Sequence, residues 1–276
     1  MKRINILSVT SIVVFTMAAM TAAQEQQLEQ QKKKLGITLD ATYVSRYLWR
    51  GFDCYPKNHS AFQPSIDLDL YGTGFGINIW SSMANRSGFE DYKELDYTLY
   101  YYNSFFKDET YVTNYKIGWV YYSYPGMSRD AANMQEIFTT FSWPKILPFG
   151  VVPSYTAACL WAAERESDVR QYGGWFHIFG LGYDLNLPKL LPNTDKQVVH
   201  LSMDIVYNDG AYCPSDTTKY TSVDHDWSHA VFGISAPLCL SENLTFTPGF
   251  YYQSSWEDSV NEHDEHWASL SLTYKF

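Results

Sequence analysis

Two arginines lie four residues apart and could act together on an anionic group. Arg46 and Arg50 lie in the segment 36–50, where apolar and polar residues alternate. Alternate residues of a β-strand share a face, so both arginines project away from the face that carries Tyr47 and Trp49. Because a cationic side chain facing lipid costs about 2–4 kcal/mol at the middle of a bilayer, the arginines are expected to face an aqueous interior.

The next alternating segment, 61–71, carries carboxylates on one face. Antiparallel pairing with the first segment predicts Arg46 opposite Asp67 and Val44 opposite Asp69. If these segments line the interior of a barrel, guanidinium and carboxylate groups that face each other across it would expose a permeating solute to a transverse electric field. The alternative interpretation is a set of salt bridges that helps to fill a narrow barrel.

The same alternation places polar residues on the interior face of later segments. Both signs of charge occur there, so no strong preference for anions or cations is predicted. The expected pore-lining residues are Asp40, Arg46, Arg50, Asp67, Asp69, Asn78, Asp96, Lys116 and Asp204, with Asn114, His200 and Lys275 on the same face.

A second group of residues with chemical potential lies near the end of the chain. His263, Asp264 and His266 combine imidazole and carboxylate groups that could bind zinc, copper or nickel. Their spacing is not diagnostic of a metal site, and a solvated acidic loop explains the same residues. The loop interpretation is favoured over the metal site.

Residues for covalent catalysis are not arranged convincingly. Ser228 and His229 are adjacent on one expected strand, so their side chains should point to opposite faces. The His-x-Ser-Asn-Gly signature of the phospholipases with twelve-stranded barrels is absent. Glycine-rich phosphate motifs and Cys-x-x-Cys pairs are also absent from the sequence, so neither an enzyme nor a cofactor is expected.

The elements that must position these residues are amphipathic strands. Short turns alternate with longer, more charged loops along the chain, which predicts an all-β, transmembrane antiparallel up-and-down barrel with both termini periplasmic. An even number of strands fits a single-chain barrel, although the ambiguous phase of two segments leaves ten or fourteen open. The twelve expected strands are 36–50, 61–71, 74–83, 94–104, 111–123, 133–143, 151–161, 172–186, 197–208, 226–236, 243–253 and 266–276.

The composition agrees with a chain that faces both lipid and water. Aromatic residues make up 17% of the sequence, while the mean hydropathy is only -0.28. Tyr and Trp gather near the expected strand ends, which predicts two aromatic girdles at the headgroup levels. The net charge of -10 argues against nucleic acid as a partner and fits acidic outer loops beside lipopolysaccharide.

The amino-terminal residues read as an export signal. Lys2 and Arg3 precede a short apolar run, and small residues follow it, so residues 1–23 are expected to be a signal peptide. Residues 24–35 are expected to be a disordered polar periplasmic lead-in, which leaves 36–276 as the outer-membrane barrel. The four cysteines of the sequence are Cys54, Cys159, Cys213 and Cys239. A disulfide between Cys54 and Cys213 is one of several pairings that the sequence leaves open.

Two stretches resemble known outer-membrane proteins. The sequence from Tyr43 to Phe52, YVSRYLWRGF, is similar to the opening strand of the TorF-type outer-membrane porin family of Gram-negative bacteria. The likeness continues through Ala61 to Leu70 and the Glu94-Leu95-Asp96-Tyr97 segment, and covers roughly 40–105. The last strand, ending at Phe276, resembles the closing strand that the barrel-assembly machinery reads. This resemblance implies a bacterial outer-membrane pore without a known substrate.

These observations predict a porin-like channel for passive diffusion of small hydrophilic solutes or ions. Its expected partners are outer-membrane lipid and lipopolysaccharide, the assembly machinery through Phe276, and the solutes themselves. The alternative is a plugged structural or adhesive barrel that acts through acidic outer loops, with divalent metal as a candidate ligand.

Overall fold

A computed structural model describes residues 34–276, except for 56–58, 128–132, 165–172, 189–196 and 212–221. The expected signal peptide 1–23 lies outside the described residues, as do nearly all of the lead-in 24–35 and Cys213. No helix in the described part of the chain has the length and apolar character that a membrane crossing requires.

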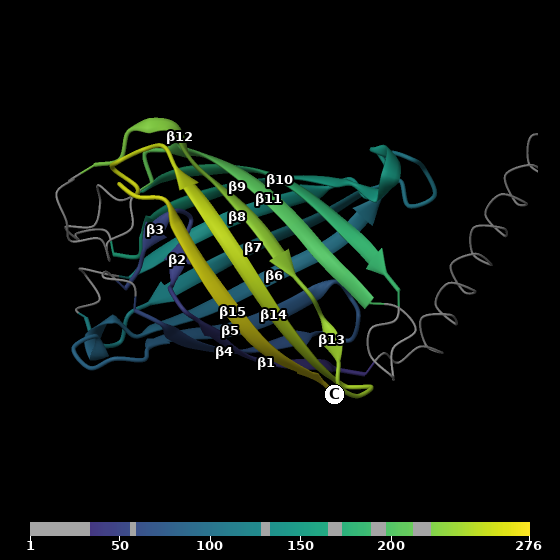
Figure 1. Cartoon of the computed structure of the whole chain (residues 1–276), viewed down its shortest axis with the longest axis horizontal. Helices are drawn as coiled ribbons and strands as arrows, with labels where there is room; N and C mark the ends of the chain where they lie inside the picture. The colour runs from purple at the N-terminus through teal and green to yellow at the C-terminus, as the bar shows by residue number, and fades with distance from the viewer. Residues whose placement is uncertain (1–33, 56–58, 128–132, 165–172, 189–196, 212–221) are drawn as a thin grey trace, which may run out of the picture. The chain divides into compact units, whose positions relative to one another are not determined.

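Twelve strands form a closed antiparallel barrel, as the alternation predicts (Figure 1). Each strand pairs with its sequence neighbours, and β1 pairs with β15 to close the ring. The two-residue β13, Leu238–Cys239, pairs with β14 beyond the end of β12. The twelve strands are β1 (Gly36–Val44), β4 (Ala61–Asp69), β5 (Phe75–Ala84), β6 (Glu94–Phe105), β7 (Thr113–Ser123), β8 (Met134–Ser142), β9 (Val152–Ala162), β10 (Gly174–Leu187), β11 (Gln197–Asp209), β12 (His225–Ser235), β14 (Leu244–Ser255) and β15 (Glu265–Lys275).

The closing seam shows why the barrel has two unlike faces. In β15, Leu270, Leu272 and Tyr274 are exposed on the outer surface, while the intervening Ser and Thr residues face inward. Asp40 of β1 lies opposite Thr273, and its carboxylate accepts hydrogen bonds from neighbouring hydroxyl groups at 2.5–2.6 Å. The alternation therefore gives the strand a lipid-compatible outer side and a polar inner side.

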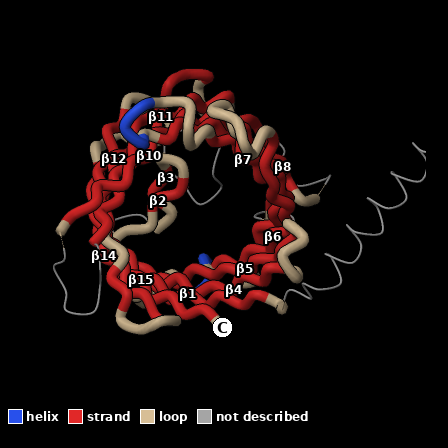
Figure 2. The backbone as a smooth tube through the Cα atoms, turned by 90° about the vertical axis from the view of Figure 1, so that its right-hand side faces the viewer, coloured by secondary structure: helices blue, strands red, loops and turns tan. Residues whose placement is uncertain are grey.

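The first predicted strand is too long. β1 ends at Val44, and the chain then turns inward to form a small hairpin of β2 (Leu48–Trp49) and β3 (Phe52–Asp53). Figure 2 shows both short strands inside the ring of the barrel. The turn uses two consecutive residues with positive φ, Arg50 at 48° and Gly51 at 97°.

The predicted register between the first two strands is also wrong. Asp67 lies opposite Thr38, and Asp69 lies opposite Gly36. Val44 instead pairs with Ala61, so the connection begins at Ser45 rather than at residue 51. The six residues counted as additional strand belong to this connection, which shifts every expected pair by the same amount.

Two short 3-10 helices complete the described elements. η1, Glu90–Tyr92, lies in the connection between β5 and β6, and η2, Pro148–Gly150, lies between β8 and β9. The longer connections and the shorter turns fall at opposite ends of the barrel, because every strand reverses direction. Gly36 and Phe276 both lie at the short-turn end, where the Phe276 N–H donates to the Ile37 carbonyl at 3.0 Å.

Candidate functional site in the barrel lumen

The segment 45–55, called here the lumenal hairpin, packs as a small hydrophobic core inside the long-loop end of the barrel. Phe52 and Tyr55 are 0% and 1% exposed. Trp49 meets the rings of Tyr122 and Phe176 edge to face, with centroids 5.7 and 5.5 Å apart. These contacts with β7 and β10 hold the hairpin against the inner wall by burying aromatic surface.

Arg50 binds the hairpin to the wall through a buried ion pair. Its two terminal nitrogens lie 2.5 and 2.7 Å from the two carboxylate oxygens of Glu136 on β8. The guanidinium also lies 4.8 and 4.7 Å from the ring centroids of Trp49 and Phe176. The Glu136 side chain is 1% exposed, so this bidentate contact is shielded from water.

Other wall residues reach the hairpin from different strands. The Tyr47 hydroxyl donates to Glu94 on β6 at 2.9 Å, and Arg46 forms an ion pair with Glu265 at the start of β15. The Gly51 carbonyl accepts hydrogen bonds at 3.1 Å from each of two side-chain amides, Gln253 and Asn261. The hairpin is therefore tied to strands that lie far apart around the ring.

Beside the hairpin lies a lumenal cavity of about 470 Å³. Its wall combines charged, hydroxyl-bearing and aromatic side chains from the strands β4 to β9 and from the hairpin itself. Such a mixed lining suits a hydrated solute better than an apolar ligand. The residues that carry its polar chemistry are Arg50, Asp67, Asn78, Asp96, Thr98, Lys116, Glu136, Thr140 and Thr156.

Neighbouring side chains already bind several of the charged groups in this cavity. Asp67 accepts hydrogen bonds from the Tyr100 hydroxyl at 2.8 Å and from the Asn78 amide at 3.3 Å. Lys116 places its ammonium group 4.0 Å from the Tyr100 ring centroid. Asp69 accepts a hydrogen bond from the Tyr102 hydroxyl at 3.1 Å, closer to the short-turn end. The carboxylates of β4 are thus held by phenols on β6 rather than by arginines.

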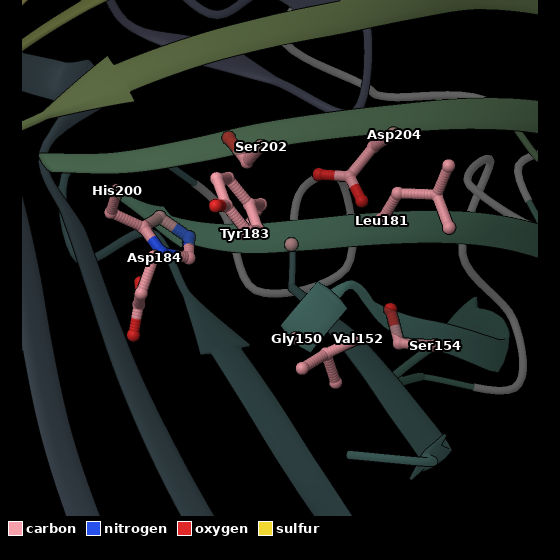
Figure 3. A pocket seen from close by; sticks show the side chains of 10 residues that line it. Gly150, Val152, Ser154, Leu181, Tyr183, Asp184, His200, Ser202 and Asp204 are labelled. Atoms are coloured by element: carbon pink, nitrogen blue, oxygen red, sulfur yellow. The ribbon is translucent and has the colours of Figure 1, made fainter. Parts of the chain in front are cut away.

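A second cavity, of about 390 Å³, opens in the lumen near the short-turn end of β9, β10 and β11. Figure 3 shows Ser154, Ser202 and Asp204 with the Asp184–His200 pair around it. The Asp184 carboxylate lies 2.6 Å from His200 Nδ1, and both side chains are well exposed. The barrel interior is therefore polar at two depths.

The expected pore-lining residues reach the interior in different ways. Asp40, Asp69 and Asp204 lie on the inward face of their strands, and five others line the larger cavity: Arg50, Asp67, Asn78, Asp96 and Lys116. Arg46 is buried against Glu265 at the wall instead. Tyr47 and Trp49 do not face lipid as expected, because the hairpin carries them into the lumen.

The strongest partners of the hairpin were not identified from the sequence. Glu94, Glu136 and Glu265 each bind a hairpin side chain. The signal that could have found them is position, because each is an acidic residue at an inward-facing place near the long-loop end of its strand.

The candidate metal ligands do not converge on a common point. Asp264 accepts hydrogen bonds from the Tyr252 hydroxyl at 2.5 Å and from the Ser255 N–H at 2.9 Å. The bond from Tyr252 lowers the pKa of Asp264. His266 lies opposite Tyr252 on the outer face of β15, while the His263 carbonyl accepts a bond from Ser255. Within the described ranges, no three His, Cys, Asp or Glu side chains are placed to hold a metal ion.

Ser228 and His229 depart from the expected geometry. A β-bulge after Val206 lets both side chains turn inward, and Ser228 Oγ lies 2.9 Å from His229 Nδ1. Both residues are only 1% exposed, and the Ser228 hydroxyl donates to the Val206 carbonyl at 3.2 Å. The pair is therefore part of the packed wall, without a substrate-accessible nucleophile.

Comparison with known proteins gives structural likenesses and no sequence family. No protein-family model matches the chain, and no curated protein matches it. The KdgM porin superposes with a TM-score of 0.51 at 9% identity, over 87% of this chain and 99% of that one. The fold is that of the porin-type barrels.

Two further structures agree with this assignment of the fold. The NanC porin superposes with a TM-score of 0.51 at 9% identity, over 86% of this chain and 100% of that one. The COG4313 outer membrane channel from Pseudomonas putida F1 gives 0.50 at 7% identity, over 88% and 95%. A second KdgM structure carries a disordered oligogalacturonate. The likeness to the TorF-type family rests on the sequence motif alone.

Gly76 on β5 makes room for the phenol that binds Asp67. A Cβ at this position would come within 2.1 Å of Tyr100 Cζ. We expect Gly76→Ala to displace Tyr100 and to lower the free energy of unfolding by about 1–3 kcal/mol, as overpacking does. Urea unfolding in lipid vesicles measures the loss. The matched control is Gly182→Ala, whose Cβ would meet its nearest neighbour at 3.5 Å. Equal losses in the two variants would contradict the expectation.

Proposed function

We propose that this chain is a bacterial outer-membrane channel through which small hydrophilic solutes or ions diffuse passively. The observation that carries the proposal is the charged cavity of about 470 Å³ inside a closed barrel with an apolar outer face. The likeness of the fold to porins and to an outer membrane channel supports it. Both termini would then be periplasmic, with the longer loops outside the cell.

The lumenal hairpin acts as the constriction of this channel. It lies inside the ring of the barrel (Figure 2), and the cavity lies beside it, with Trp49 and Arg50 on its wall. A solute moving between the two ends passes beside the Arg50–Glu136 pair. Size and charge are therefore selected at the same level of the barrel.

A location in the outer membrane also implies which molecules surround the barrel. Outward rings at both ends of the strands, such as Trp175 and Trp227 at one end and Phe105 and Tyr274 at the other, suit the two headgroup regions of a membrane. Lipopolysaccharide would contact the outer loops, and the assembly machinery would read the strand that ends at Phe276. Membership of the TorF-type family is part of the same proposal, because the motif from Tyr43 to Phe52 builds the hairpin.

Single-channel recording in a planar bilayer tests the proposal. We expect the refolded protein to give discrete, stable conductance steps, with ion selectivity measured as the reversal potential under a salt gradient. A barrel that resists urea and shifts its mobility on heating, yet stays electrically silent, would overturn the channel. That result would favour a plugged barrel acting through its outer loops, for which the buried aromatic core of the hairpin is the supporting observation.

A further inference from the structure

Acidic side chains outnumber basic ones where the hairpin meets the wall. Glu94, Asp96 and Glu136 all face inward from β6 and β8, and Arg50 pairs with Glu136 alone. Glu94 is bound by two phenols, since the hydroxyls of Tyr47 and Tyr124 donate to it at 2.9 and 2.8 Å. Buried carboxylates without a counter-ion are unfavourable, so this layer of the barrel favours a cation from outside the chain.

Asp96 is the carboxylate that lacks compensation. It is 9% exposed and lies on the wall of the larger cavity. Its Oδ1 atom has no hydrogen-bond partner, and no Lys, Arg or His in the described ranges forms an ion pair with it. Asp96 therefore gives the cavity an acidic group whose ionised form has no ion-pair partner among the described side chains, so a bound cation would supply the missing partner.

Five aromatic rings line the same cavity as Asp96, and one of them is Phe138 on β8. Trp80 and Tyr122 come from the strands on either side and lie directly opposite it, while Tyr47 and Trp49 come from the hairpin. The ring centroids of Tyr47 and Trp80 lie 5.7 Å apart, as do those of Trp49 and Tyr122. The negative faces of aromatic rings attract cations, and Trp does so most strongly.

The composition of the wall selects the kind of cation. A bare metal ion needs several oxygen or nitrogen ligands around one point, and the described side chains offer no such group of three. A carboxylate among aromatic rings is instead suited to an alkylated ammonium, which is weakly hydrated and makes contact over its whole surface. The cavity of about 470 Å³ has room for a small organic ion together with water.

We infer that the lumenal cavity binds small organic cations carrying an ammonium group, with Asp96 as the counter-ion and Trp80 as the principal ring. The inference deepens the proposed channel function, because it gives that channel a preferred solute class. The ammonium enters from the short-turn side of the hairpin and remains beside Asp96 without any covalent step.

Calorimetric titration of choline into the refolded protein in detergent micelles tests the inference. We expect saturable binding to the wild type, and affinity at least about tenfold lower in Asp96→Asn, which removes the charge and keeps the shape. Trp80→Leu should weaken binding as well. The matched control is Asp258→Asn, which removes one negative charge from an exposed loop and should leave the affinity unchanged.

The outcomes separate this inference from the channel proposal. No binding of choline to the wild type, equal affinity in Asp96→Asn, or equal competition by sodium at the same ionic strength would each overturn the ammonium site. Choline binding in a protein that conducts no current would retain the site and remove the channel. Current without choline binding would retain the channel and remove the ammonium site. A heat-modifiability gel on every variant shows that the barrel has folded.

Discussion

Replacing Arg50 with Met is expected to lower the free energy of unfolding by about 3–5 kcal/mol, because it leaves Glu136 as an uncompensated buried carboxylate. The Glu136 side chain is 1% exposed beside Arg50, and the guanidinium is the only cation that forms an ion pair with it in the described structure. The variant also loses the stacking of the guanidinium on Trp49 and Phe176. Urea unfolding in lipid vesicles, followed by tryptophan fluorescence, measures the change.

Two further variants isolate the ion pair. Lys116→Met removes a cation from the same cavity, but its ammonium packs on the Tyr100 ring and forms no ion pair in the described structure, so a much smaller loss is expected. The double variant Arg50→Met with Glu136→Gln removes the stranded charge and should recover most of the stability. If the double variant is as unstable as Arg50→Met, the loss belongs to packing and not to the buried charge.

Replacing residues 46–55 of the lumenal hairpin with a flexible Gly/Ser segment of equal length is expected to raise single-channel conductance by about twofold or more. The hairpin places Tyr47, Trp49 and Phe52 inside the barrel, where they exclude water from the cross-section. A solvated loop in the same place leaves the strand wall unchanged and the lumen wider. Conductance steps in a planar bilayer give the answer directly.

The control replaces residues 106–111 in the same manner. That turn joins β6 to β7 at the short-turn end, and its side chains are exposed rather than directed into the lumen. Its replacement should leave the conductance steps at the wild-type size. Unchanged conductance after removal of the hairpin would show that the constriction lies elsewhere, and the cavity near Asp204 would become the next place to test.

The barrel itself was predictable because every strand has to meet the same requirement within its own sequence. One face must be apolar and the other polar, so the period of two in segments such as 61–71 and 266–276 determines both the strand and its orientation. Short turns and long loops alternate for the same reason, since antiparallel strands reverse direction at every connection. These are properties of single segments, so they can be recognised without knowing which strands lie beside each segment.

The hairpin was not predictable from that pattern. The period of two continues from Gly36 to Arg50 through the end of β1, so it cannot distinguish a long strand from a strand followed by a buried turn. The local signal is the Arg50-Gly51 pair, because Gly readily adopts the positive φ that the turn requires. Its conformation is determined by partners such as Glu136, which lies 86 residues further along the chain.

The candidate site was predictable in type but not in pairing. Alternation predicts Asp67 and Asp96 on the polar face of their strands, yet their partners depend on which strand lies beside them. Arg46 finds Glu265 and not Asp67, because the ring closes β1 against β15. The motif from Tyr43 to Phe52 and the segment that begins with Glu94 resemble one family together, and the structure joins them through the Tyr47–Glu94 bond.

The wall contacts of the hairpin also give it a place in the order of assembly. Arg46 lies just after the first strand, while Glu265 begins the last one, and the two meet only when β1 pairs with β15. Gln253, which binds the Gly51 carbonyl, is contributed by the penultimate strand. An open sheet or a ring closed in the wrong register would leave the guanidinium of Arg46 and the carboxylate of Glu265 apart in a dry interior. The hairpin therefore stabilises the correctly closed barrel over other closures, because its bonds can all form only when the first and last strands are correctly paired.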